Sequence, residues 1–141
     1  MRHNYLLILI AAVTVYTSAW LHAADVKVIA NSSVKVSSIS ADDLKRVFLA
    51  TKTSLEDGSH VEPVLEKGGA THALFLKEYL GKTEAALDMY YRSLVFTGKG
   101  AMPKTLANDA EVAAYVVKTR GAIGYVSASA AAGDAKVLEV K

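Results

Sequence analysis

Hydrophobic positions along the chain switch between the spacing of strands and the spacing of helices. Runs rich in β-branched residues predict short strands at residues 26–30, 61–65, 123–126 and 136–140. In the segments between them, apolar side chains recur at i, i+3, i+4 and i+7, which is typical of helices with one buried face. Strands that alternate with helices predict an α/β fold with a small mixed sheet flanked by helices.

Capping residues predict where the helices begin and end. Ser40, Thr83 and Asn108 each precede an apolar helical pattern and are expected as N-caps. A further helix is predicted over residues 70–80, with Gly81 ending it. The remaining connections are expected as loops at residues 31–38 and 97–103, and as one short helical turn at residues 127–132.

The first 23 residues have the pattern of a secretory signal peptide. Arg2 supplies a positive start, an apolar stretch follows from Leu6 to Val15, and small residues around Ala23 offer a cleavage site. The apolar stretch falls short of the roughly 20 residues that a membrane span needs. We therefore expect cleavage, export to the periplasm, and a single domain at residues 24–141.

Composition narrows the function further. The chain has no cysteine, which excludes disulfides, thiol catalysis and thiolate metal sites. Its formal net charge of +2 gives no basic surface of the kind that binds nucleic acid. No serine stands in a nucleophile-elbow motif, so we expect neither enzymatic activity nor a cofactor. His60 and His72 lack a metal-ligand partner at helical spacing, and solvated or capping roles are expected for both.

One candidate anion site is the glycine turn that leads from the second predicted strand into a helix. Lys67, Gly68, Gly69, Ala70 and Thr71 would place free backbone N–H groups, a charge and a hydroxyl at the helix start. Glycines also let a ligand approach the backbone closely. The alternative is an ordinary strand-to-helix turn whose glycines serve conformation.

A second group of donors follows the first predicted strand. Ser32 and Ser33 lie beyond its carboxyl end, where ligands gather in open α/β sheets. An ordinary polar turn is the alternative for these residues.

Three segments in a fixed order resemble the phosphate-binding proteins of ABC transporters, and specifically their later lobe. They are residues 36–49 (Val-Ser-Ser-Ile-Ser-Ala-Asp-Asp-Leu-Lys-Arg-Val-Phe-Leu), residues 75–80 (Phe-Leu-Lys-Glu-Tyr-Leu), and residues 111–116 leading into 120–126 (Arg-Gly-Ala-Ile-Gly-Tyr-Val). The resemblance implies a type 2 periplasmic-binding fold. Because members have two lobes and this chain is about half their size, it implies a single lobe.

The resemblance also implies a ligand, namely phosphate or a related oxyanion. The family pattern Arg-Ser-Asp-Gly-Ser-Gly-Thr falls on the glycine turn, where its arginine meets Glu66 and its serine meets Ala70. The turn thus loses a bidentate cation and gains a carboxyl group. Two interpretations stay open: weak oxyanion recognition linked to phosphate transport or sensing, or a ligand-free adaptor. The adaptor would dock on a membrane sensor, porin or transporter, or self-associate to rebuild a second lobe.

Overall fold

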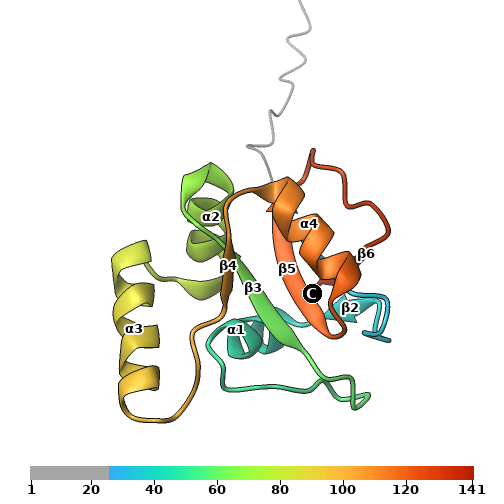
Figure 1. Ribbon diagram of the computed structural model, residues 1–141. Helices are drawn as coiled ribbons and strands as arrows, with labels where there is room; N and C mark the ends of the chain where they lie inside the picture. The colour runs from blue at the N-terminus through green and yellow to red at the C-terminus, as the bar shows by residue number, and fades with distance from the viewer. Residues whose placement is uncertain (1–25) are drawn as a thin grey trace, which may run out of the picture.

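A computed structural model describes residues 26–141 (Figure 1). The predicted signal peptide, residues 1–23, lies outside the described residues. Six strands and four helices follow one another, and a π-helical segment, η1, continues the second helix. In chain order they are β1 (Val26–Ala30), β2 (Ser38–Ile39), α1 (Ala41–Phe48), β3 (Glu62–Glu66), α2 (Gly69–Phe75), η1 (Leu76–Leu80), α3 (Glu84–Phe96), β4 (Lys104–Leu106), α4 (Asp109–Lys118), β5 (Ala122–Ser127) and β6 (Lys136–Val140).

The strands form one mixed sheet in the order β2-β6-β1-β5-β3-β4. Strand β1 is antiparallel to both of its neighbours, and its register with β5 sets Val28 opposite Tyr125. Strand β3 is parallel to both β5 and β4. The carboxyl ends of β1 and β3 consequently lie at opposite ends of the sheet.

Alternating side chains along each strand supply two separate cores, one on each face of the sheet. On β5, Ile123 and Tyr125 point to one face, while Ala122 and Val126 point to the other. Helix α4 covers the second face and is drawn over β5 in Figure 1. Helices α1, α2 and α3 and segment η1 pack their buried side chains against the strands in the first core. This arrangement confirms the predicted α/β fold with a small mixed sheet flanked by helices.

The predicted caps close the helices where the sequence indicated. The Ser40 hydroxyl accepts the Asp43 N–H at 3.0 Å, and the Asn108 side chain accepts the Glu111 N–H at 3.0 Å. Thr83 caps α3 by accepting an N–H at 3.2 Å. Gly81 ends η1 in the left-handed conformation at φ +60°. No helix within residues 26–141 is long and apolar enough to cross a membrane.

Two short strands escaped prediction, and one predicted turn is not helical. Strand β2 lies at the end of the expected loop and pairs with β6, while β4 follows the second expected loop and pairs with β3. Both are too short to show a period in the sequence, and hydrogen bonds to distant strands define them. Ser127 is the last residue of β5, and residues 128–132 form a turn and a loop rather than a helical segment.

Two glycines bring β5 into close contact with its surroundings. Gly121 has φ +78°, and a Cβ at this position would lie 2.7 Å from the carbonyl oxygen of His60. Gly124 lies under α4, where a Cβ would meet Val112 Cγ1 at 2.9 Å. Gly121, just before β5, and Gly124, within it, therefore each allow a close contact that a side chain would block.

We expect Gly121→Ala to destabilise the fold by about 3 kcal/mol, because it combines a left-handed backbone with a backbone clash. Gly133→Ala is the matched control, since Gly133 has φ +58° but open space around it; it should cost only about 1 kcal/mol. Urea unfolding of both variants measures the difference. Equal losses would contradict a packing role for Gly121.

Candidate functional site

The structure separates the predicted site residues into two groups. Lys67, Gly68, Gly69, Ala70 and Thr71 follow the carboxyl end of β3, while Ser32 and Ser33 follow the carboxyl end of β1. The second group lies beside the start of β5, because the Asn31 N–H donates to the Ala122 carbonyl at 2.8 Å. One small anion cannot contact both groups, so each is a separate candidate site.

The glycine turn has the backbone shape of an anion site. Gly68 and Gly69 have φ values of +74° and +89°, and no side chain caps the first N–H groups of α2. Lys67, Gly69 and Ala70 are exposed, and Thr71 is half-buried. Nothing lies within 4 Å of a Cβ built on Gly69. The turn is therefore open to a ligand.

Carboxyl groups surround this turn. A cleft of about 220 Å³ beside it is lined by Glu66, Glu84 and Asp88, with Lys67 as the lysine among its lining residues. Glu84 Oε1 would lie only 3.8 Å from a Cβ at Gly68. Repulsion from the Glu84 and Asp88 carboxylates opposes binding of a phosphate dianion here.

Glu66 itself is a protonated acid at neutral pH. Its side chain is 5% exposed, and its Oε1 atom has no hydrogen-bond partner among the described residues. Burial, reinforced by a hydrogen bond and repulsion from Asp109, raises the pKa of Glu66 to about 8. The sequence interpretation counted Glu66 as a repulsive charge, whereas in the folded chain the charge near the turn comes from Glu84 and Asp88.

Asp109 is the charged partner of Glu66. Burial alone would raise the pKa of Asp109, but hydrogen bonds from Glu66 and Ser127 outweigh it and hold that pKa below its usual value. The Ser127 hydroxyl donates to Asp109 Oδ2 at 2.7 Å and the Ser127 N–H donates at 3.2 Å. Two carboxyl groups can share a hydrogen bond only when a proton lies between them, and here Glu66 carries it.

His72 is buried, which corrects the expectation of a solvated or capping histidine. Its Nδ1 lies 2.5 Å from the Tyr125 hydroxyl, which also accepts the Glu66 N–H at 3.0 Å. Burial lowers the pKa of His72, although Glu84 and Asp88 act in the opposite direction. The Tyr125 hydroxyl and His72 Nδ1 share one hydrogen bond, and the tautomer of the ring decides which of the two donates. His72 lines both the cleft above and a larger one of about 470 Å³ between α2 and the start of α3.

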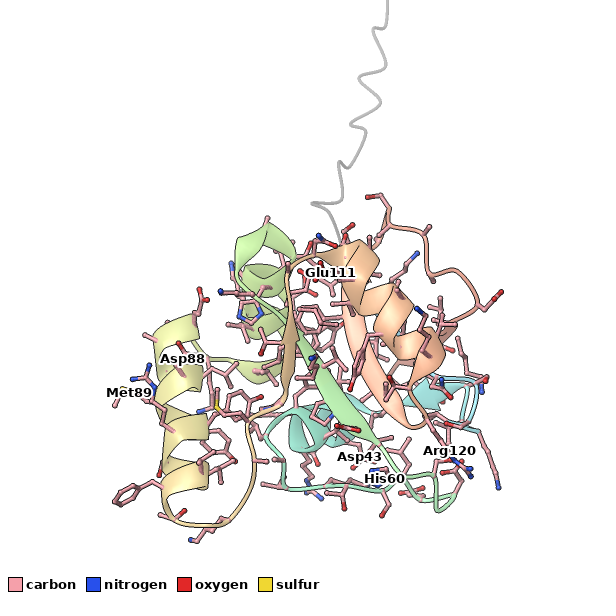
Figure 2. The ribbon with its side chains drawn as sticks, in the orientation of Figure 1. Asp43, His60, Asp88, Met89, Glu111 and Arg120 are labelled. Carbon is pink, nitrogen blue, oxygen red and sulfur yellow. The ribbon has the colours of Figure 1, made fainter. Side chains whose placement is uncertain are left out.

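The Ser33 group opens onto a different electrostatic setting. A cleft of about 210 Å³ is lined by Ser33, Lys35 and Arg120, together with Gly58, Ser59 and His60. Figure 2 shows His60 and Arg120 side by side at this end of the sheet. Among residues 26–141, neither Lys35 nor Arg120 forms an ion pair, although the charge of Lys35 acts on Asp57 and helps to lower its pKa. We call this the basic cleft.

Hydrogen bonds hold the walls of the basic cleft. The Ser33 hydroxyl oxygen accepts the Gly121 N–H at 2.9 Å, and the Ser59 hydroxyl oxygen accepts the Lys35 N–H at 3.2 Å. The Ser59 hydroxyl in turn donates to Asp57 at 2.7 Å, which holds the pKa of Asp57 below its usual value. Ser32 is exposed at the rim of the turn and is not among the lining residues.

Sequence reasoning missed both Arg120 and Lys35 as site residues. Neither stands in a cationic motif, and only the antiparallel pairing of β1 with β5 brings the two segments together. In the described part of the chain, no group of three or more histidine or acidic side chains could hold a metal ion.

Comparison with solved structures identifies the fold. The chain superposes on a Borrelia burgdorferi PstS with a TM-score of 0.64 and 12% identity, over 84% of this chain and 47% of that one. A Clostridium perfringens protein assigned to the phosphate ABC transporter substrate-binding proteins, solved with bound phosphate, gives a TM-score of 0.64 and 13% identity over 83% and 45%. A Vibrio cholerae ABC-type phosphate transport receptor gives a TM-score of 0.53 and 11% identity, over 83% of this chain and 46% of that one.

The chain spans less than half the length of these proteins and matches roughly one lobe of them. This confirms the predicted single-lobe fold, and at such identities the likeness extends to the fold alone. No protein-family model matches the chain, and no curated protein matches its sequence.

We expect Glu66→Gln to change how stability depends on pH. In the native chain, the unfolded state releases the Glu66 proton near its ordinary pKa of 4.5, and the folded state holds it to about 8. The contribution of Glu66 to the free energy of unfolding is therefore fully present below pH 4.5 and is lost as the pH rises towards 8. The glutamine variant should be more stable than the native chain by about 1–3 kcal/mol at pH 8 and above.

Thermal unfolding between pH 5 and pH 9 measures this effect. Glu62→Gln is the matched control, because Glu62 is exposed on the same strand, and its variant should follow the native profile. A native profile without the decline towards pH 8 would contradict the buried, protonated state of Glu66.

Tyr125→Phe should destabilise the fold by about 1–3 kcal/mol, because it leaves the Glu66 N–H and His72 Nδ1 without a partner. Tyr115→Phe is the control: the Tyr115 ring lies near Lys104 Nζ at 5.8 Å and this contact survives the change. Urea unfolding should show a loss below about 0.5 kcal/mol for the control. If both variants lost the same free energy of unfolding, the hydrogen bonds of the Tyr125 hydroxyl would not stabilise the fold as expected.

Proposed function

We propose that the chain is an exported, solute-binding-protein-like module of the periplasm that recognises phosphate or a related oxyanion, in connection with phosphate transport or sensing. The fold supports this proposal, because it matches one lobe of phosphate-binding proteins. The observation that carries it is the basic cleft, where Lys35 and Arg120 converge without ion-pair partners in the described part of the chain.

The basic cleft suits an oxyanion for three reasons. Arginine offers a planar fork of N–H donors that matches phosphate or carboxylate oxygens. The lysine and serine groups add a second charge and a hydroxyl donor. The walls are held by hydrogen bonds before a ligand arrives, so little ordering entropy is lost on binding.

The glycine turn is the second location for the same ligand. Its open N–H groups favour an anion, whereas Glu84 and Asp88 oppose one. We therefore assign the stronger anion contact to the basic cleft, and keep Lys67 and Thr71 as predicted contacts of a weaker one.

Titration of the protein with phosphate and sulfate, followed by calorimetry and thermal unfolding, tests both locations. We expect Arg120→Met to weaken phosphate binding by about tenfold or more, as for loss of a charge-assisted pair. Lys67→Met should leave it nearly unchanged, and Lys118→Met on α4 is the control for overall charge. Each of the three side chains is a cation exposed to solvent, so none of these changes should impair folding.

The opposite pattern would move the site to the glycine turn. If Lys67→Met and Thr71→Ala weaken binding while Arg120→Met does not, the assignment to the basic cleft is wrong. If no oxyanion raises the unfolding temperature, oxyanion recognition itself is excluded, because a ligand that binds only the folded state must stabilise it.

The second candidate function is an adaptor that has kept the fold without a ligand and docks on a membrane sensor, porin or transporter. The carboxyl groups around the glycine turn favour it, since they stand where the resemblance implies an anion. Absence of any oxyanion effect, together with retention of the protein by such a membrane partner, would support this alternative.

A further inference from the structure

Helix α3 has two apolar faces, and only one of them is covered. Leu87 and Tyr91 are buried against the rest of the domain, where the Tyr91 hydroxyl donates to the Phe48 carbonyl and the Tyr90 hydroxyl donates to the Leu49 carbonyl at 2.6 Å. On the opposite side, Met89 is 71% exposed and Phe96 is 92% exposed. Figure 1 shows α3 at the edge of the domain, and Figure 2 shows Met89 pointing away from it.

The exposed apolar residues of α3 lie in one stripe along the helix, together with Arg92. Ala85, Met89, Arg92 and Phe96 are spaced by four, three and four residues, which places them on one side of a helix. This is the spacing of the seam between two packed helices. An exposed phenylalanine and methionine seven residues apart on such a stripe indicate a surface that another helix covers.

The distribution of charges along α3 indicates which helix would cover this stripe. The first half of the helix carries Glu84 and Asp88, whereas Arg92 lies in the second half and Lys99 follows its end. Arg92 belongs to the stripe and Asp88 lies beside it, and neither forms an ion pair among the described residues. A second copy of α3 in antiparallel orientation would set each acidic half against a basic half, while a parallel copy would set like charges together.

We propose that two copies of the chain associate through the outer faces of α3, antiparallel and related by a twofold axis. Phe96 of each copy packs near Ala85 of the other, and Met89 packs against the aliphatic part of Arg92. Each Arg92 guanidinium then reaches the Asp88 carboxylate of the other copy. This surface is separate from the basic cleft, and it shares Asp88 with the cleft beside the glycine turn. The proposal does not depend on anion binding.

The size of the surface predicts weak association. A helix of 13 residues is about 20 Å long, and a single helix pair buries less than the roughly 800 Å² per partner of a standard interface. We therefore expect a monomer at low micromolar concentration and a dimer at high micromolar to millimolar concentration. High salt should weaken the dimer, because exposed charge pairs contribute to it.

Sedimentation velocity of the purified protein over that concentration range measures the association. Phe96→Ala should weaken it by about tenfold or more, as expected of an aromatic anchor, without lowering the unfolding temperature of the monomer. Val137→Ala on β6 is the matched control, since Val137 is also an exposed apolar residue, at 52%, and should leave association unchanged.

Charge reversal tests the orientation. Asp88→Arg alone and Arg92→Asp alone should each weaken the dimer, and the double variant should restore it, because the pairs between copies are then reversed together. A monomer at every concentration overturns the proposal. So does binding to anionic lipid vesicles through α3 without self-association, because a membrane surface would then be the partner. A dimer that survives Phe96→Ala and both single reversals would exclude this surface.

Discussion

The buried hydroxyl and ring of Tyr125 connect the parts of this domain that carry its chemistry. The ring stacks on Phe75 with centroids 3.9 Å apart, which fixes α2 against β5. The hydroxyl accepts the Glu66 N–H and pairs with His72, so that the end of β3 and the first turns of α2 have one position. Because a buried polar group without a partner is costly, this small network constrains the glycine turn more strongly than packing alone could.

The two ends of the sheet carry side chains of opposite charge. Near the carboxyl end of β3, Glu66, Glu84, Asp88 and Asp109 gather around a turn whose backbone would otherwise suit an anion. At the opposite end, Lys35 and Arg120 line the cleft around Ser33, and Asp57 interacts electrostatically with Lys35. The chain therefore has a fold that matches roughly one lobe of the phosphate-binding proteins, and acidic side chains lie beside its glycine turn. Burial together with Asp109 raises the pKa of Glu66, so that the two carboxyl groups are not both charged at neutral pH.

The apolar outer face of α3 follows from the same single-lobe architecture. A small domain has little surface with which to bury a helix on all sides, so α3 covers the core with Leu87 and Tyr91 and leaves Met89 and Phe96 in solvent. The charges along α3 would favour an antiparallel copy of the same helix over other partners for this face, as proposed above.

Local patterns in the sequence determined most of the elements of this fold. Period, caps and glycine signals depend on neighbouring residues, which is why the caps Ser40, Thr83 and Asn108 and the stop at Gly81 were predictable. Strands β2 and β4 were not, because pairing with distant strands defines them. The proton on Glu66, the burial of His72 and the meeting of Lys35 with Arg120 were decided only by tertiary structure. Each of these three features depends on burial or on contact with a residue that is distant in the sequence. The spacing of residues along the chain does not reveal burial or distant contacts.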